Sequence, residues 1–152
     1  MASSLTITAS TVDPGLLALP WSTPLAQWPS SVIVSLPKGL SRHLVRFAVL
    51  SGGVVAVKET TEEMARREYE MLGNLTRLAV PCVDRAAVIA GRSDASGKPL
   101  PAALVTTHLK FSLPYRALFQ QVLRPDTATR LVDALAVLLV RLHNVGFFWG
   151  DV

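Results

Sequence analysis

Three short stretches rich in β-branched residues most constrain what this chain can fold into. They cover residues 32–36, 44–50 and 54–57, with Gly39 and the pair Gly52-Gly53 between them. Short apolar stretches divided by glycines are typical of consecutive antiparallel strands, because glycine allows the tight reversals that such strands need. The pattern therefore predicts a three-stranded antiparallel meander.

A helix is predicted to follow at residues 61–79, where the apolar residues have a helical period. Thr60 or Thr61 can cap it, Glu62 and Glu63 fall in its first turn, and Pro81 stands beyond its end. A hydroxyl at the cap and acidic side chains in the first turn stabilise a helix start, and proline ends the helix.

Two more apolar stretches, residues 83–90 and 102–107, flank a loop at 91–101 that contains Ser, Asp, Gly and Pro. We expect them to form two further strands. The predicted fold class is thus α+β, with a five-stranded antiparallel sheet over residues 31–109 and one helix behind it.

The two ends of the chain differ from this central region. Residues 1–30 are predicted to form an extended arm with little regular structure, held by aromatic anchors at Trp21 and Trp28, because they carry four prolines. Residues 110–152 are predicted to form helices, one from Pro114 to about residue 123 and one over 127–144. The second is apolar on nearly every side, as in a helix surrounded by other elements. We therefore expect a helical region that is incomplete in this sequence.

Composition excludes several classes of protein. The net charge is +4, but the basic residues are scattered rather than clustered, which argues against a nucleic-acid partner. No apolar run approaches the ~20 residues of a membrane span, and residues 1–14 lack the pattern of a signal peptide. The single Cys82, expected to be a small buried apolar residue, suits a reducing compartment. These features predict a cytoplasmic chain without a membrane span.

A charged pair is the first candidate site. On the wheel of the 61–79 helix, Glu68 lies in the middle of an apolar stripe, and a buried carboxylate requires a cation. Lys58, which ends the run 54–57, is the expected partner, because the helix follows directly and can pack across that sheet face. In the alternative interpretation, Lys58 lies at a sheet edge and Glu68 pairs locally with a helix neighbour such as Arg67 or the exposed backbone of Leu72. The expected stripe consists of Met64, Met71, Leu72, Leu75 and Leu78.

The residues around this pair resemble a known family. Val54-Val55-Ala56-Val57-Lys58 resembles the Val-Ala-Ile-Lys strand of protein kinases, and Arg67-Glu68-Tyr69-Glu70-Met71-Leu72 is similar to the helix that follows it in small-molecule and saccharide kinases. The resemblance implies a kinase-like nucleotide-binding lobe. Within it, Lys58 would bind the phosphates of ATP and Glu68 would hold the lysine in place.

The C-terminal segment carries the second resemblance. Leu142-His143-Asn144-Val145-Gly146-Phe147-Phe148-Trp149-Gly150-Asp151 resembles the Leu-His-x-x-Gly-x-x-His-Gly-Asp segment of lipopolysaccharide-kinase-like and aminoglycoside-kinase-like proteins. It implies that Asp151 orients the attacking hydroxyl and accepts its proton. Trp149 departs from the His or Arg of most relatives. The alternative for Asp151 is a turn residue near a terminus.

Two weaker parts of the site follow from position. Gly39, Ser41 and Arg42 lie where kinases have a glycine-rich loop over the phosphates, although a polar hairpin explains them equally well. His108 and Leu109 fall where the kinase hinge meets adenine, and His108 can instead be a surface loop residue.

The resemblance covers most of residues 31–151, and residues 20–29 together with 39–46 and 111–116 resemble an uncharacterised bacterial kinase-like family. It implies transfer of a phosphoryl group from ATP, with Mg²⁺, to a hydroxyl of a sugar, a lipid-linked saccharide or a small metabolite. The family's metal ligands would follow Val152, so we expect this chain alone to be inactive. A pseudokinase or interaction module, and a truncated product that folds poorly, are the alternative hypotheses.

Overall fold

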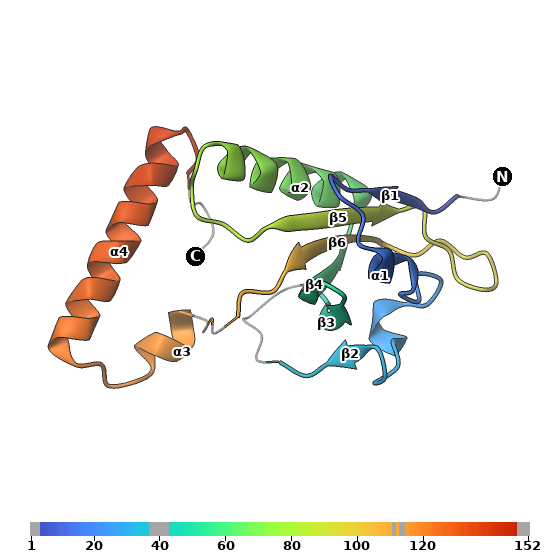
Figure 1. Ribbon diagram of the computed structural model, residues 1–152, viewed down its shortest axis with the longest axis horizontal. Coiled ribbons are helices and arrows are strands. Elements are labelled where there is room, and N and C mark those ends of the chain that lie inside the picture. The colour runs from blue at the N-terminus through green and yellow to red at the C-terminus, as the bar shows by residue number, and fades with distance from the viewer. Residues whose placement is uncertain (1–3, 37–42, 111, 113–114, 149–152) are drawn as a thin grey trace.

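The computed structural model describes residues 4–36, 43–110, 112 and 115–148. Its described strands form one antiparallel sheet in the order β1-β5-β6-β4-β3-β2, and together with the helices they make an α+β fold (Figure 1). The elements in chain order are β1 (Thr6–Thr8), α1 (Pro14–Leu17), the short 3-10 helix η1 (Leu25–Gln27), β2 (Ile33–Val34), β3 (Val45–Leu50), β4 (Gly53–Thr60), α2 (Glu62–Arg77), β5 (Arg85–Ala90), β6 (Ala102–Thr107), α3 (Tyr115–Phe119) and α4 (Pro125–Asn144).

The five predicted strands are present as β2 to β6, but the sheet has a sixth strand. β1 lies in the segment expected to be irregular and pairs antiparallel with β5, Thr6 opposite Ala90 and Thr8 opposite Val88. The prediction of five strands was therefore wrong, and the arm that was expected to have little regular structure contributes one short strand. The physical reason is that β5 is buried from Ala87 to Ala90 and would otherwise present unpaired backbone groups at an apolar edge.

The N-terminal segment covers one face of the sheet, as Figure 1 shows. Trp21 and Trp28 are each only 4% exposed, and their rings meet edge to face with centroids 5.2 Å apart. The prediction of aromatic anchors is confirmed. The rest of this core comes from alternate residues of the strands and from the segment itself: Leu16, Leu19, Leu25, Ala48, Leu50, Val55, Val57, Ala87, Ile89, Ala103 and Val105.

Helix α2 covers the other face, over β5 and β6. Thr61 caps it, because its hydroxyl accepts a hydrogen bond from the Met64 amide at 3.2 Å. The buried side of the helix carries Ala65, Tyr69, Leu72 and Leu75. The predicted stripe is wrong in part, since Met64, Met71 and Leu78 are 48%, 38% and 40% exposed. The helix is rotated toward Ala65 because this small residue allows close packing on the sheet, so Glu68 lies near the margin of the buried side.

Helix α4 stands apart from the sheet in Figure 1, and none of its residues is buried. We expected other elements to surround this apolar helix, but the described residues do not cover it. Val132, Val137 and Val140 are each more than half exposed. Within the described part of the chain, no helix is long and apolar enough to span a membrane.

Candidate functional site

Strand β4 places Lys58 on the face of the sheet that α2 covers. Side chains alternate along a strand, so Val55 and Val57 enter the core beneath the N-terminal segment, while Ala56 and Lys58 point to the opposite face. β4 lies between β3 and β6, where Lys58 is opposite Val45 and Leu104. Lys58 is therefore on an interior strand, which contradicts the alternative of an edge residue.

Lys58 and Glu68 form the predicted ion pair. The Lys58 ammonium donates a hydrogen bond to Oε2 of Glu68, so the expected partner is confirmed over the local partner Arg67. The two side chains are 23% and 33% exposed. The pair is therefore partly open to solvent rather than deeply buried. Since an ammonium has three donors and one contacts Glu68, the remaining donors can meet an anion from solvent.

An apolar surface extends from Lys58 across the part of the sheet beside α2. We call it the β3–β4 face; it consists of Val45, Phe47, Val49, Val54 and Ala56, which point to the same side by register. Val49 is 59% exposed, and the Phe47 ring meets the His108 ring edge to face at 5.1 Å. Phe47 is only 8% exposed, so the face is open at Val49 and closed at Phe47, with the Lys58 cation beside it.

The expected hinge residues lie next to this face. The His108 amide donates to the Val54 carbonyl at 2.9 Å, so the sheet already uses the N–H that could have met a base. Leu109 is 50% exposed. The structure thus brings His108 to the β3–β4 face through its ring. The other predicted site residues, Gly39, Ser41, Arg42 and Asp151, lie outside the described residues.

A second polar centre, which the sequence analysis missed, lies on the opposite face of β4. Glu59 alternates with Lys58, and its Oε1 accepts from Arg92 Nη1 at 2.9 Å and from the Leu25 amide at 3.0 Å. Arg92 is 2% exposed and also donates to the carbonyls of Trp21, Thr23 and Pro101 at 3.0, 2.8 and 2.9 Å. Strand alternation was the available signal, because it predicts that Glu59 enters the core and requires a cation.

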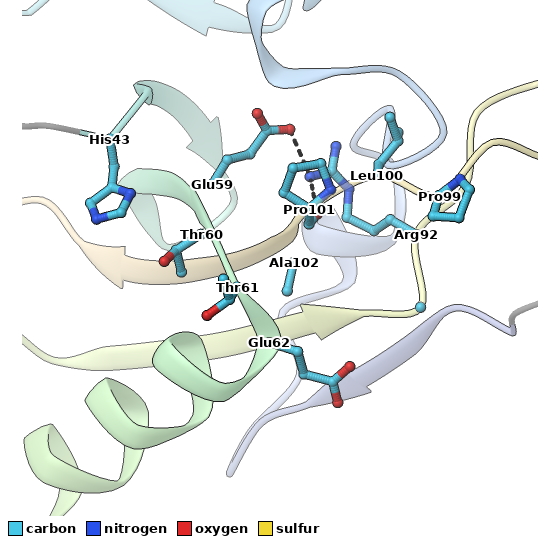
Figure 2. Close-up of a pocket in the computed structure, with 11 residues that line it drawn as sticks. His43, Glu59, Thr60, Thr61, Glu62, Arg92, Pro99, Leu100, Pro101 and Ala102 are labelled. Atoms are coloured by element: carbon cyan, nitrogen blue, oxygen red, sulfur yellow. Dashed lines mark hydrogen bonds and ion pairs between the residues drawn. The ribbon is translucent and has the colours of Figure 1, made fainter.

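An open groove of about 610 Å³ borders this ion pair (Figure 2). In Figure 2 the carboxylate of Glu59 reaches toward the guanidinium beside Pro101. Arg92 donates its hydrogen bonds to Glu59 and to three backbone carbonyls, which indicates a structural role for this centre. The groove is lined by His43, Glu59, Thr60, Thr61, Glu62, Gly91, Arg92, Pro99, Leu100, Pro101 and Ala102.

The carboxylates of Asp13 and Asp94 organise turns and have lowered pKa values. The pKa of Asp13 lies below its usual value because the carboxylate accepts from the Ser51 hydroxyl and the amides of Gly15 and Gly52. The pKa of Asp94 is lowered by hydrogen bonds from Ser96 and from the Lys98 amide in the β5–β6 hairpin. Both stabilise the backbone rather than a ligand.

Across residues 4–36, 43–110, 112 and 115–148, no group of three or more His, Cys, Asp or Glu side chains could hold a metal ion. Cys82, which was expected to be buried, is partly buried, and its thiol lies 3.7 Å from the Leu72 carbonyl. No family model, curated protein or solved structure matches this chain.

Proposed function

We propose that this chain binds the phosphates of a nucleoside triphosphate at Lys58, as the nucleotide-binding lobe of a kinase-like phosphotransferase. The observation that carries the proposal is the ion pair between a lysine on an interior strand and a glutamate on the helix that follows it. In kinases such a pair holds an ammonium against the phosphates of ATP. The carboxylate restrains the flexible lysine, so less conformational entropy is lost when phosphate binds.

The surroundings of the pair support a nucleotide over a simple anion. The β3–β4 face lies directly beside Lys58, and its apolar side chains can contact a flat base while the ammonium contacts phosphate. The His108 ring stands at this face, edge to face with the buried Phe47 ring, and supplies an aromatic surface. An isolated surface ion pair would lack this apolar neighbour.

The proposal extends to the reaction by resemblance alone. Asp151 would accept the proton of a hydroxyl on a sugar, a lipid-linked saccharide or a small metabolite, and Mg²⁺ would offset the phosphate charge. The described residues supply the phosphate-binding cation but no metal cluster. The chain's own contribution is thus to position the phosphates.

Thermal unfolding with and without MgATP tests the proposal. At a nucleotide concentration ten times the dissociation constant, binding stabilises the native state by about 1.4 kcal/mol, which raises Tm by about 3–6 °C. Lys58→Met should abolish this shift, and Glu68→Gln should reduce it. Lys98→Met is the matched control, because Lys98 lies in the exposed tip of the β5–β6 hairpin, and should retain the full shift.

An unchanged shift in Lys58→Met would refute the site, and no shift in a folded wild-type protein would refute nucleotide binding. Binding without transfer of phosphate to any hydroxyl acceptor would instead support the pseudokinase.

A further inference from the structure

Arg85, the first residue of β5, lies across helix α2 at Gly73. Its Nη1 donates to the Tyr69 carbonyl at 3.2 Å, and its guanidinium carbon stands 4.4 Å from the centre of the Tyr69 ring. A Cβ atom at position 73 would overlap the guanidinium group. Glycine inside a helix is destabilising, so its presence here indicates that the space it leaves is used. We call Arg85, Gly73 and Tyr69 the α2 clamp.

The clamp holds α2 at the residue next to the glutamate of the proposed site. Tyr69 follows Glu68 directly and is 7% exposed. Its hydroxyl accepts from the Ser10 amide at 3.0 Å, so Tyr69 is held from one side by the N-terminal segment and from the other by Arg85. Contacts on two sides of one helical residue restrict rotation of the helix about its axis.

Rotation matters because Glu68 has to reach beyond the strands on which α2 rests. The helix packs on β5 and β6, whereas Lys58 is on β4. The apolar cluster beneath the helix consists of Ala65, Tyr69, Val88, Ala102 and Leu104, and Leu72 and Leu75 are also buried on this side. A modest rotation of the helix about its axis would carry the Glu68 carboxylate away from Lys58.

We propose that Arg85 is a positioning residue for the nucleotide site: through the α2 clamp it sets the orientation of α2 in which Glu68 reaches Lys58. This inference rests on the proposed function for its consequence, namely that the affinity for nucleotide depends on a residue that does not touch the nucleotide. The state of the ion pair can be measured without any nucleotide.

The ¹⁵N resonance of the Lys58 ammonium reports the pair directly. The sequence contains four lysines, Lys38, Lys58, Lys98 and Lys110, so the spectrum is simple, and Lys58→Met assigns the signal. We expect Arg85→Met and Gly73→Ala to move the Lys58 signal toward its position in Glu68→Gln. Arg77→Met, which on the same helix loses only a contact with Asn74, should leave the signal in place.

Gly73→Ala separates positioning from simple stabilisation. Alanine favours the helix, so a purely structural view predicts an equally stable or more stable protein with the ion pair intact. We expect circular dichroism to show retained helix while the Lys58 signal moves. A Lys58 signal that stays at its wild-type position in both Arg85→Met and Gly73→Ala would overturn the inference.

The functional arm uses MgATP as the probe. We expect Arg85→Met to weaken binding about fivefold, the size of one lost cation–π contact, and Glu68→Gln to add little in the double variant, because both changes remove the same pair. Fully additive losses would overturn the inference. If wild-type protein does not bind MgATP, the proposed function fails, while the Lys58 signal still decides whether the clamp positions Glu68.

Discussion

Replacement of Arg92 by methionine should cause a large loss of stability. The guanidinium side chain has no exposed area, while the side chain of its ion-pair partner Glu59 is 14% exposed. Arg92 also donates to the carbonyls of Trp21, Thr23 and Pro101, so it joins the N-terminal segment to β4 and to the β5–β6 connection. Methionine fills similar space but donates no hydrogen bond.

The magnitude follows from what the change leaves behind. Glu59 would keep the Leu25 amide as a donor and the Thr23 carbonyl would keep the Trp28 indole N–H, whereas the carbonyls of Trp21 and Pro101 would lose the Arg92 donor. Removing one partner of a buried ion pair costs about 3–5 kcal/mol, because the other charge stays buried and uncompensated. That loss is a large fraction of the 5–15 kcal/mol that stabilises a typical domain, so we expect a marginally folded protein.

Urea unfolding followed by tryptophan fluorescence measures the effect, since Trp21 and Trp28 are buried beside this centre. Arg77→Met, on exposed helix surface, is the matched control and should cost no more than about 0.5 kcal/mol. Adding Glu59→Gln to Arg92→Met should recover part of the loss, because no charge then remains buried. A change below about 1 kcal/mol for Arg92→Met would refute this reasoning.

Three further predictions concern local structure. Thr61→Ala should lower the free energy of unfolding by about 1 kcal/mol in urea titrations, because the Met64 amide loses its cap. Gly53→Ala should cost about 1 kcal/mol by the same assay, since Gly53 has φ of 129°, and an unchanged midpoint would contradict this. Asp13 has a lowered pKa, so its contribution is complete above the ordinary aspartate pKa and disappears as pH falls below about 4. The urea concentration at the unfolding midpoint should therefore fall over that pH range, and this fall should be smaller in Asp13→Asn. An equal fall in Asp13→Asn would mean that the bond to Ser51 contributes nothing.

Most of the sheet could be predicted from sequence because its signals are local. Apolar stretches and turn glycines placed five strands close to their observed positions. The sixth strand escaped because Thr6–Thr8 is too short to show a pattern. Its formation depends on an unpaired edge of β5, which is about eighty residues away in the chain and is visible only after folding.

The same distinction applies to the candidate site, where contacts between nearby residues could be predicted from the sequence and the packing of α2 could not. Strand alternation and the helical period were enough to predict that Lys58 meets Glu68, since only ten residues separate them. The exact face of α2 was not predictable from apolar periodicity alone, because the small Ala65 and the partly polar Tyr69 are buried while two methionines are exposed. Packing against β5 and β6 decides that face.

The sequence by itself determined where strands β2 to β6 and the start of α2 lie and that Lys58 meets Glu68, because each depends on residues nearby in the chain. Tertiary structure alone decided that Arg92 neutralises Glu59 from 33 residues away and that Arg85 occupies the space left by Gly73. Those contacts join segments with no shared periodicity. The sequence indicates that a buried charge needs a partner and that a helix glycine leaves space beside it. Only the packed fold decides which residue supplies the partner or fills the space.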